Sequence, residues 1–287
     1  GFLNKKNHQV LKSFDQLTDI LGKINPKIIV LNESTLPINR AIIQVSKELG
    51  IQTIEIQHAI YPYEMKILPG IGTDFVYVWG DFFKKMYNHQ NIRNSNTIKI
   101  LGYPFKTNFQ NKLNFNKKLT LYYLAQGFHN QDIKNLDRLL NNALNLRKLS
   151  NSLNIKFKCK LHPNSPKVLL NKVYPHIKCN PLTQTMEDAI SDGDIFISFN
   201  STALIEAAFQ GKKCIQLMNL PVESDNFEDL GICKTFLNFK DLNLYLTSFF
   251  RLNKNNVLDQ KNSINDKYIK AFDGGPGLRF TNLIEKI

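Results

Sequence analysis

The chain alternates between short apolar runs and longer segments in which apolar residues recur at helical spacing. Short runs of this kind are typical of buried strands, and the longer periodic segments are typical of amphipathic helices. We expect strands at 27–31, 52–56, 74–79, 97–101, 119–125, 155–161, 176–179, 194–199 and 213–217. We expect helices at 9–24, 37–49, 81–88, 130–152, 183–190, 202–210 and from about Pro276 onward. Strands that alternate with helices predict right-handed crossovers and parallel sheets.

Two polar stretches rich in Asn and Lys interrupt this alternation, at 106–118 and 251–268. The first separates the two series of elements and is interpreted as a linker. A length of 287 residues fits two domains of about 100–200 residues each. The predicted fold class is therefore α/β, with two doubly wound domains that face a shared cleft.

The composition is that of a soluble globular protein, with 43% hydrophobic and 21% charged residues. No apolar run approaches the roughly 20 residues of a membrane span. The formal net charge of +13 favours an anionic partner: nucleic acid, an anionic membrane surface or a phosphorylated small molecule. The basic residues are scattered, which argues against nucleic acid. The four cysteines form no CxxC pair, so we expect reduced thiols in a cytoplasmic protein.

Polar residues follow most of the predicted strands. In doubly wound sheets, ligands bind outside the carboxyl ends of the strands, so these positions are the candidate site residues. They are Asn32, Glu33, Ser34, Thr35, Gln57, His58, Gly80, Asp81, Gln126, Gly127, His162, Pro163, Asn200, Ser201 and Thr202. Because helix N-caps also favour Ser and Thr, the pair at 201–202 could simply cap the next helix.

The segments around His162 and Ser201 predict a phosphate site. A helix that begins near Thr202 presents free backbone N–H groups to the cleft, and the hydroxyls of Ser201 and Thr202 can add donors. His162 can donate a hydrogen bond to the same phosphate or protonate it as it leaves. Glu206, one turn into the helix, can accept from a ribose hydroxyl or interact with the helix dipole. Gln126 and Gly127 are expected nearby.

His162-Pro163 and Ser201-Thr202 resemble the donor-binding motifs of GT-B glycosyltransferases. They look most like bacterial capsule and lipooligosaccharide enzymes that use CMP-activated sialic acid or Kdo, and like teichoic-acid polymerases that use CDP-glycerol. In those enzymes a His-Pro motif and a later Ser/Thr pair hold the nucleotide phosphate. The resemblance implies two Rossmann-like domains and a nucleotide-binding role for these residues and for Asn200.

The resemblance covers most of 28–217 in order, and 41–58, 74–80 and 100–104 look like the acceptor-side half of such enzymes. In those enzymes the first domain is usually longer, so we expect a trimmed or divergent N-terminus in this chain, which begins with Gly1. The segment 273–277 is similar to one that crosses back onto the first domain. The expected division is an acceptor-side domain at 1–105, a linker at 106–118, a nucleotide-sugar domain at 119–270 and a returning helix at 271–287.

An inverting transfer needs a base that takes the proton of the acceptor hydroxyl. The acceptor-side strand ends offer Glu33, His58 and Asp81. We predict Glu33 as the base, because a carboxylate beside an apolar strand can have a raised pKa, and His58 as an orienting group. Each also has a structural interpretation: Glu33 as a helix cap and His58 as a residue packed under a loop.

Other motifs argue against a metal and against other cofactors. Asp192-Gly193-Asp194 has DxD spacing but precedes a strand, so we interpret it as a turn. The remaining histidines lack HxH or HExxH spacing. No GxGxxG or GxxxxGK[ST] segment occurs. We therefore expect no metal and no cofactor, with a nucleotide-sugar donor as substrate.

Three hypotheses for the function follow. The leading one is a metal-independent, inverting glycosyltransferase that uses a nucleotide sugar, with a CMP-sugar favoured, to build a bacterial surface polysaccharide or glycolipid. The second is a CDP-alditol transferase or a sugar-nucleotide epimerase on the same fold. The third is a non-catalytic nucleotide-sugar-binding module. The expected acceptor is a glycan or a lipid-linked glycan, and the basic surface would allow peripheral association with the inner face of the plasma membrane.

Overall fold

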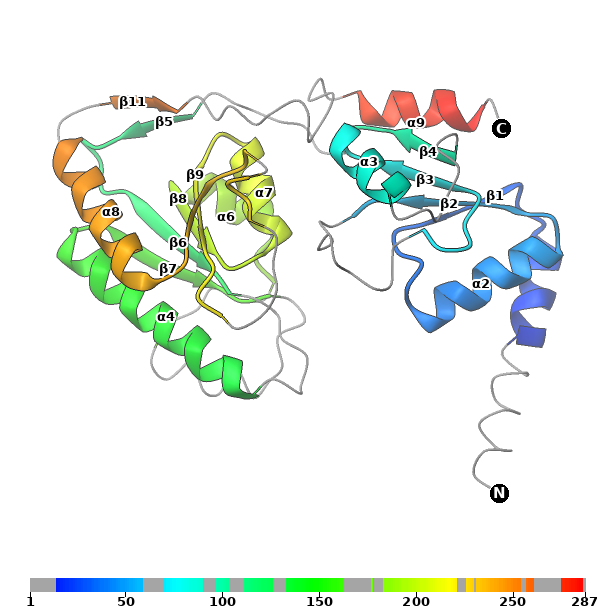
Figure 1. Cartoon of the computed structure of the whole chain (residues 1–287), viewed down its shortest axis with the longest axis horizontal. Coiled ribbons are helices and arrows are strands. Elements are labelled where there is room, and N and C mark those ends of the chain that lie inside the picture. The colour runs from blue at the N-terminus through cyan, green and yellow to red at the C-terminus, as the bar shows by residue number, and fades with distance from the viewer. Residues whose placement is uncertain are drawn as a thin grey trace. The chain divides into compact units, whose positions relative to one another are not determined.

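The computed structural model describes residues 14–58, 70–89, 97–103, 111–125, 133–162, 177, 183–220, 226–229, 231–253, 257–260 and 275–285. The chain divides into two compact units (Figure 1). Unit 1 comprises residues 1–106 and 266–287, and unit 2 comprises residues 107–265. Within the described residues, no helix is both long and apolar enough to cross a bilayer.

Unit 1 is built on a parallel sheet with the strand order β1-β2-β3-β4. Its strands are β1 (Ile28–Leu31), β2 (Gln52–Ile56), β3 (Phe75–Val78) and β4 (Ile98–Ile100). The central strands β2 and β3 are largely buried. Strand β1 pairs only with β2 among the described strands, and Val30 is 45% exposed. It is therefore an edge strand, not the fully buried strand that its sequence suggests.

Helices cover both faces of the unit 1 sheet. Residues 14–24 are helical. Helices α2 (Pro37–Glu48) and α3 (Asp81–His89) connect the strands, and Figure 1 shows α2 below the sheet and α9 (Pro276–Ile284) above it. Phe280 of α9 packs edge-on against Tyr77 with ring centroids 5.6 Å apart. The Arg279 Nε atom donates to the Leu101 carbonyl oxygen at 2.7 Å. The C-terminal helix thus belongs to unit 1.

Unit 2 is built on a parallel sheet with the order β10-β9-β8-β6-β7. Its strands are β6 (Thr120–Leu124), β7 (Lys156–Lys160), β8 (Ile195–Ser198), β9 (Lys213–Leu217) and β10 (Lys234–Phe236). Its helices are α4 (Ile133–Ser152), α6 (Met186–Asp192), α7 (Thr202–Phe209) and α8 (Phe239–Leu252). Residues of α4 and α8 join one face of the sheet in the main core, whereas α7 contacts β8 and β9.

The order of the unit 2 strands reverses between β6 and β8. From β6 the chain passes outward to β7, and then returns to the other side of β6 to add β8, β9 and β10. Neighbouring connections therefore leave in opposite directions at this point, and doubly wound sheets bind ligands beside the carboxyl ends of the strands at such a reversal. The prediction of strands that alternate with helices in parallel sheets is confirmed.

The structure differs from the predicted elements in four places. Within 106–118, strand β5 (Asn111–Asn114) pairs antiparallel with β11 (Val257–Gln260), which lies in the second polar stretch. The pairing is explained by Leu113, which is buried in the core of unit 2. Strand β10 and helix α8 were not predicted. Helix α6 begins three residues later than expected, because Thr185 caps it. The predicted strand at 176–179 lies outside the described residues, except for residue 177.

Candidate functional site

The carboxyl edge of the unit 2 sheet holds polar groups at the point where the strand order reverses. Asn200 and Ser201 follow β8, which pairs with β6. The Asn200 Oδ1 atom is buried and has no hydrogen-bond partner within the described part of the chain. A buried acceptor without a partner is costly, so this atom is suited to accept from a hydroxyl or amide of a ligand.

Helix α7 begins at this edge with a side-chain cap. Ser201 is its N-cap, and the Ser201 Oγ atom accepts from the backbone N–H of Ala203 at 3.3 Å. The hydroxyl proton of Ser201 remains available for donation, and the first backbone N–H groups of the helix point toward its amino end. Ser201 and Thr202 are half-buried. This end of α7 has the donors and the dipole direction that suit an anion.

His162 follows β7, the neighbour of β6 on the other side. Its side chain reaches solvent, but partial burial of the imidazole and the positive charge of Lys160 lower its pKa below the ordinary value. Lys160 itself is buried at the end of β7, and its ammonium donates to the backbone carbonyl of Gln184. Burial lowers the pKa of Lys160, and the nearby Asp188 opposes that shift. For His162, burial and the Lys160 charge both favour the uncharged imidazole, which has one donor and one acceptor nitrogen.

Glu206 lies one turn into α7 and is half-buried. Burial raises the pKa of its carboxyl group. The structure thus brings His162, Asn200, Ser201, Thr202 and Glu206 to the same edge of the unit 2 sheet or to the helix that starts there. The predicted site residues Gln126, Gly127 and Pro163 lie outside the described residues.

The carboxyl edge of the unit 1 sheet carries a hollow of about 480 Å³. Its described lining is mostly apolar, with three polar side chains: Asn32, Gln57 and His58. His58 is exposed. Gln57 is fixed in place, because its Oε1 atom accepts from the Trp79 backbone N–H at 2.9 Å and its carbonyl accepts from the Trp79 indole N–H at 2.8 Å. His58 therefore directly follows a residue that is tied to β3 by two hydrogen bonds.

Glu33 is held by its own loop. The Thr35 hydroxyl donates to its Oε1 atom, and the Asn39 side chain donates to its carbonyl oxygen at 2.6 Å. Glu33 is not among the described residues that line the hollow, whereas His58 is. The structure thus places the two predicted acceptor-side residues differently, although both follow neighbouring strands.

The sequence interpretation missed Glu55, a fully buried carboxylate in β2. Its Oε2 atom and the Ser34 Oγ atom accept from the backbone N–H of Gly70, at 2.7 and 2.6 Å. Gly70 has φ +79°, and a Cβ there would lie 2.3 Å from Val76 Cγ2. The available signal was an acidic residue between two isoleucines of a predicted strand. The hydrogen bond from Gly70 joins β2 to the turn that precedes β3.

Comparison with solved structures defines the architecture. S. aureus MnaA, solved with UDP, aligns over 97% of this chain and 80% of its own length, with a TM-score of 0.66 and 13% identity. The UDP-GlcNAc 2-epimerase of Methanocaldococcus jannaschii, in complex with UDP-GlcNAc and UDP, aligns over 97% and 81%, with a TM-score of 0.66 and 15% identity. Acinetobacter baumannii MurG aligns over 98% and 79%, with a TM-score of 0.56 and 13% identity. The fold is GT-B-like.

This confirms the predicted fold class of two Rossmann-like domains. A scan against protein-family models and a search of curated proteins found no match. At such low identity the likeness establishes the fold alone, so the narrower resemblance to sialic acid, Kdo and CDP-glycerol enzymes stays a prediction.

In this GT-B-like chain, the DxD segment lies at the opposite end of the unit 2 strands from Ser201. Asp192 accepts from the Tyr122 hydroxyl at 2.6 Å and pairs with Lys158 at 2.5 Å. Asp194 accepts from the Thr120 backbone N–H at 2.9 Å and pairs with Lys117 at 2.9 Å. Gly193 leaves no space for a side chain, since a Cβ would lie 2.3 Å from the Phe196 ring. Both carboxylates thus have structural partners.

Proposed function

We propose that this protein is a glycosyltransferase that takes its sugar from a nucleotide-activated donor bound at the carboxyl edge of unit 2. The main supporting observation is that the capped start of α7 at Ser201, the His162 imidazole and the Asn200 Oδ1 atom share the edge where the strand order reverses. Among the described residues, that Asn200 atom has no hydrogen-bond partner. Polar groups that converge at such a point are the expected form of a nucleotide site.

Each of these groups has a role in the proposed donor site. The α7 N–H groups and the Ser201 and Thr202 hydroxyls would neutralise the donor phosphate. His162 would donate its one imidazole N–H to the same phosphate. Asn200 Oδ1 would accept from a ligand hydroxyl or amide, and Glu206 from a ribose hydroxyl. These are protein groups, so the proposal keeps the predicted metal independence. Gln126, Gly127 and Pro163 remain proposed members of the site.

Unit 1 would supply the acceptor side. In the transfer, the acceptor hydroxyl oxygen bonds to the anomeric carbon, the bond from that carbon to the phosphate oxygen breaks, and the nucleotide leaves with the bonding electron pair. The hydroxyl proton passes to a base. The hollow favours His58 for this role, because His58 lines it, and Glu33 is the competing candidate.

A sugar-nucleotide epimerase is the second candidate. It is supported by the likeness to UDP-GlcNAc 2-epimerase structures. An epimerase needs no acceptor, whereas a transferase needs a second binding site, for which the hollow of unit 1 is the candidate. Incubation with UDP-GlcNAc, followed by NMR of the sugar ring protons, separates the two: a 2-epimer formed without any acceptor would establish epimerisation.

The setting we propose is the synthesis of a bacterial surface polysaccharide or glycolipid at the cytoplasmic face of the membrane. The His-Pro and Ser/Thr resemblance favours a CMP-sugar, whereas two of the solved structures above hold UDP. The donor nucleotide is therefore the first quantity to measure.

Isothermal titration calorimetry with CMP, CDP and UDP tests the proposal. We expect at least one nucleotide to bind, His162→Ala to weaken that binding roughly tenfold or more, and the matched unit 1 variant His58→Ala to leave it unchanged. Binding that responds to His58→Ala and not to His162→Ala would contradict the proposed site. Absence of binding by all three would contradict a nucleotide site at this edge.

A further inference from the structure

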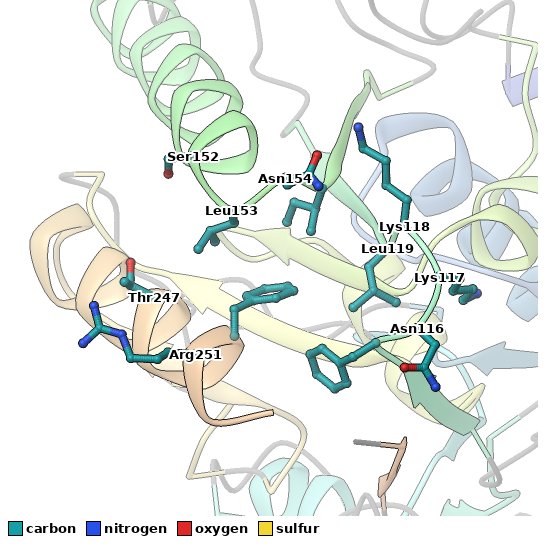
Figure 2. Close-up of a pocket in the computed structure, with 12 residues that line it drawn as sticks. Asn116, Lys117, Lys118, Leu119, Ser152, Leu153, Asn154, Thr247 and Arg251 are labelled. Atoms are coloured by element: carbon teal, nitrogen blue, oxygen red, sulfur yellow. The ribbon is translucent and has the colours of Figure 1, made fainter. Parts of the chain in front are cut away.

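A second hollow, of about 740 Å³, lies at the amino edge of the unit 2 sheet (Figure 2). It is formed by the segment that leads into β6, the turn between α4 and β7, and the last turns of α8. Figure 2 shows Lys117 to Leu119, Ser152 to Asn154, and Thr247 with Arg251 around it. The residues proposed to bind the nucleotide follow the opposite ends of these strands, so this hollow is separate from the donor site.

The hollow combines an apolar floor with a cationic rim. The floor includes the buried Leu119 and Ile155 and the partly buried Phe115 and Phe250, whose rings pack edge-to-face with centroids 5.7 Å apart. The rim carries Lys117, Lys118 and Arg251, and no Asp or Glu is among the described lining residues. An unbalanced positive rim attracts an anion, and an apolar floor attracts hydrocarbon.

Two of the three rim cations have no acidic partner within the described residues. Lys117 is paired with Asp194 at 2.9 Å, so its charge is partly compensated. For Lys118 and Arg251, both exposed, the described ranges contain no salt bridge. Within the described residues, these two side chains can therefore reach an anion without breaking an ion pair.

Helix α8 adds exposed apolar surface beside this rim. Leu252, next to Arg251, is 77% exposed, and Leu244 is 59% exposed. Leu244, Thr247 and Arg251 are spaced i, i+3 and i+7, so they share one face of the helix. Large exposed leucines beside cations are a feature of surfaces that contact a membrane.

We propose that this hollow and the adjoining face of α8 bind the surface of an anionic membrane. Lys118 and Arg251 would contact a lipid headgroup phosphate, the floor would receive the apolar part just below it, and Leu244 and Leu252 would enter the interface. A soluble phosphorylated molecule in the hollow would leave these two leucines exposed, which is why we favour a lipid. The inference deepens the proposed function, since an enzyme that acts on a lipid-linked acceptor works at a membrane surface.

Vesicle co-sedimentation of the full chain tests this proposal. The probes are vesicles of pure phosphatidylcholine and vesicles with about 30% phosphatidylglycerol, whose negative surface potential attracts basic residues. We expect binding to the anionic vesicles only. The double variant Lys118→Glu/Arg251→Glu is expected to bind them at least roughly thirtyfold more weakly, because each Lys or Arg near such a surface contributes about a fivefold factor. Leu244→Ser/Leu252→Ser is expected to bind several-fold more weakly.

The matched control is Lys27→Glu/Lys47→Glu, which makes the same change in net charge on exposed residues of unit 1. If this control still binds the vesicles, binding depends on the specific surface of unit 2. If the two charge-reversal double variants lose binding equally, the proposal is overturned, because the net charge of the whole protein would then explain the binding. The membrane proposal would also be overturned if the protein did not bind anionic vesicles, or if millimolar glycerol phosphate abolished the binding.

The affinity for nucleotide, measured in the same variants, should be unchanged. If neither the wild type nor any variant binds nucleotide, the proposed function is contradicted. The vesicle result decides the membrane proposal independently of that outcome.

Discussion

The two units begin their helices differently at the carboxyl edges of their sheets. In unit 2, α7 follows β8 and is capped by Ser201. In unit 1, α2 follows β1 with Leu36 at the N-cap position, no side-chain cap and Pro37 in the first turn. Proline has no N–H to donate and leucine has no polar group, so the start of α2 offers fewer donors to an anion. The phosphate-binding features are concentrated in unit 2.

The two sheets also differ in their strand order and in the residues at their carboxyl edges. The strand order reverses in unit 2 and runs without reversal through the described strands of unit 1. The unit 2 edge carries polar groups, including a buried acceptor without a partner, whereas the unit 1 edge carries an apolar hollow with His58 on its rim. In the proposed function, this difference assigns the charged nucleotide to unit 2 and the less charged acceptor to unit 1.

The largest expected effect concerns the base in unit 1. General base catalysis contributes roughly 10²–10⁴-fold. We therefore expect His58→Gln to lower the rate of transfer by about that factor while nucleotide affinity stays unchanged. Glu33→Gln, measured in parallel, is expected to have the smaller effect. A greater loss in Glu33→Gln would assign the base to Glu33, and full activity in both variants would remove the catalytic role of this edge.

The next effect concerns His162 in unit 2. Loss of a hydrogen bond to a charged group costs about 1.5–3 kcal/mol, so His162→Ala should reduce donor use roughly ten- to hundredfold. Because the pKa of the free imidazole is lowered and a bound phosphate favours its protonated form, nucleotide affinity should rise as the pH falls toward that lowered pKa. Calorimetry across this range should show the dependence in the wild type and lose it in His162→Gln. The same pH dependence in His162→Gln would show that another group is responsible.

A smaller effect is expected at the cap of α7. Ser201→Ala should lower the free energy of unfolding by about 1 kcal/mol, because the cap is lost, and should weaken nucleotide binding by up to roughly tenfold. The matched control is Asn238→Ala, which removes the cap of α8, where Asn238 Oδ1 accepts from Asp241 N–H at 2.9 Å. That control should lose similar stability and keep its nucleotide affinity. Equal affinities in the two variants would reduce Ser201 to a structural cap.

The smallest expected effect is that of Glu206→Gln, which should raise stability and lower the affinity for nucleotide. Burial raises the pKa of Glu206, so its ionisation lowers the stability of the fold progressively as the pH rises from its ordinary pKa to the raised one, and the cost is absent only below the ordinary pKa. Glu206→Gln should therefore raise the unfolding temperature of the ligand-free protein at neutral pH, with no gain at acid pH, and should also weaken nucleotide binding. A gain in stability with unchanged affinity would show that Glu206 does not touch the ligand.

The alternation of elements could be predicted because buried parallel strands such as β8 are continuous apolar runs, and the amphipathic helices repeat clearly. The pairing of β5 with β11 could not, because β5 has a single apolar residue and the two strands are far apart in sequence. Helix α8 was missed although Leu242, Leu246 and Phe249 recur at helical spacing after Asn238. Because His162 and Ser201 follow strands of one predicted sheet and His58 follows a strand of the other, the sequence could predict the sheet edge at which each of them lies. The hollow is lined by residues in or directly after β1, β2 and β3. No single stretch of the sequence could therefore show that His58 lines it and Glu33 does not.

Amide hydrogen exchange with and without the nucleotide that binds most tightly tests the central claim most directly. Ligand contact or ordering protects backbone N–H groups, so each peptide reports on its own segment. The account predicts that added nucleotide protects 198–206, at the start of α7, more strongly than 28–35 or 52–58 of unit 1. Protection confined to the unit 1 segments, with 198–206 unchanged, would contradict it.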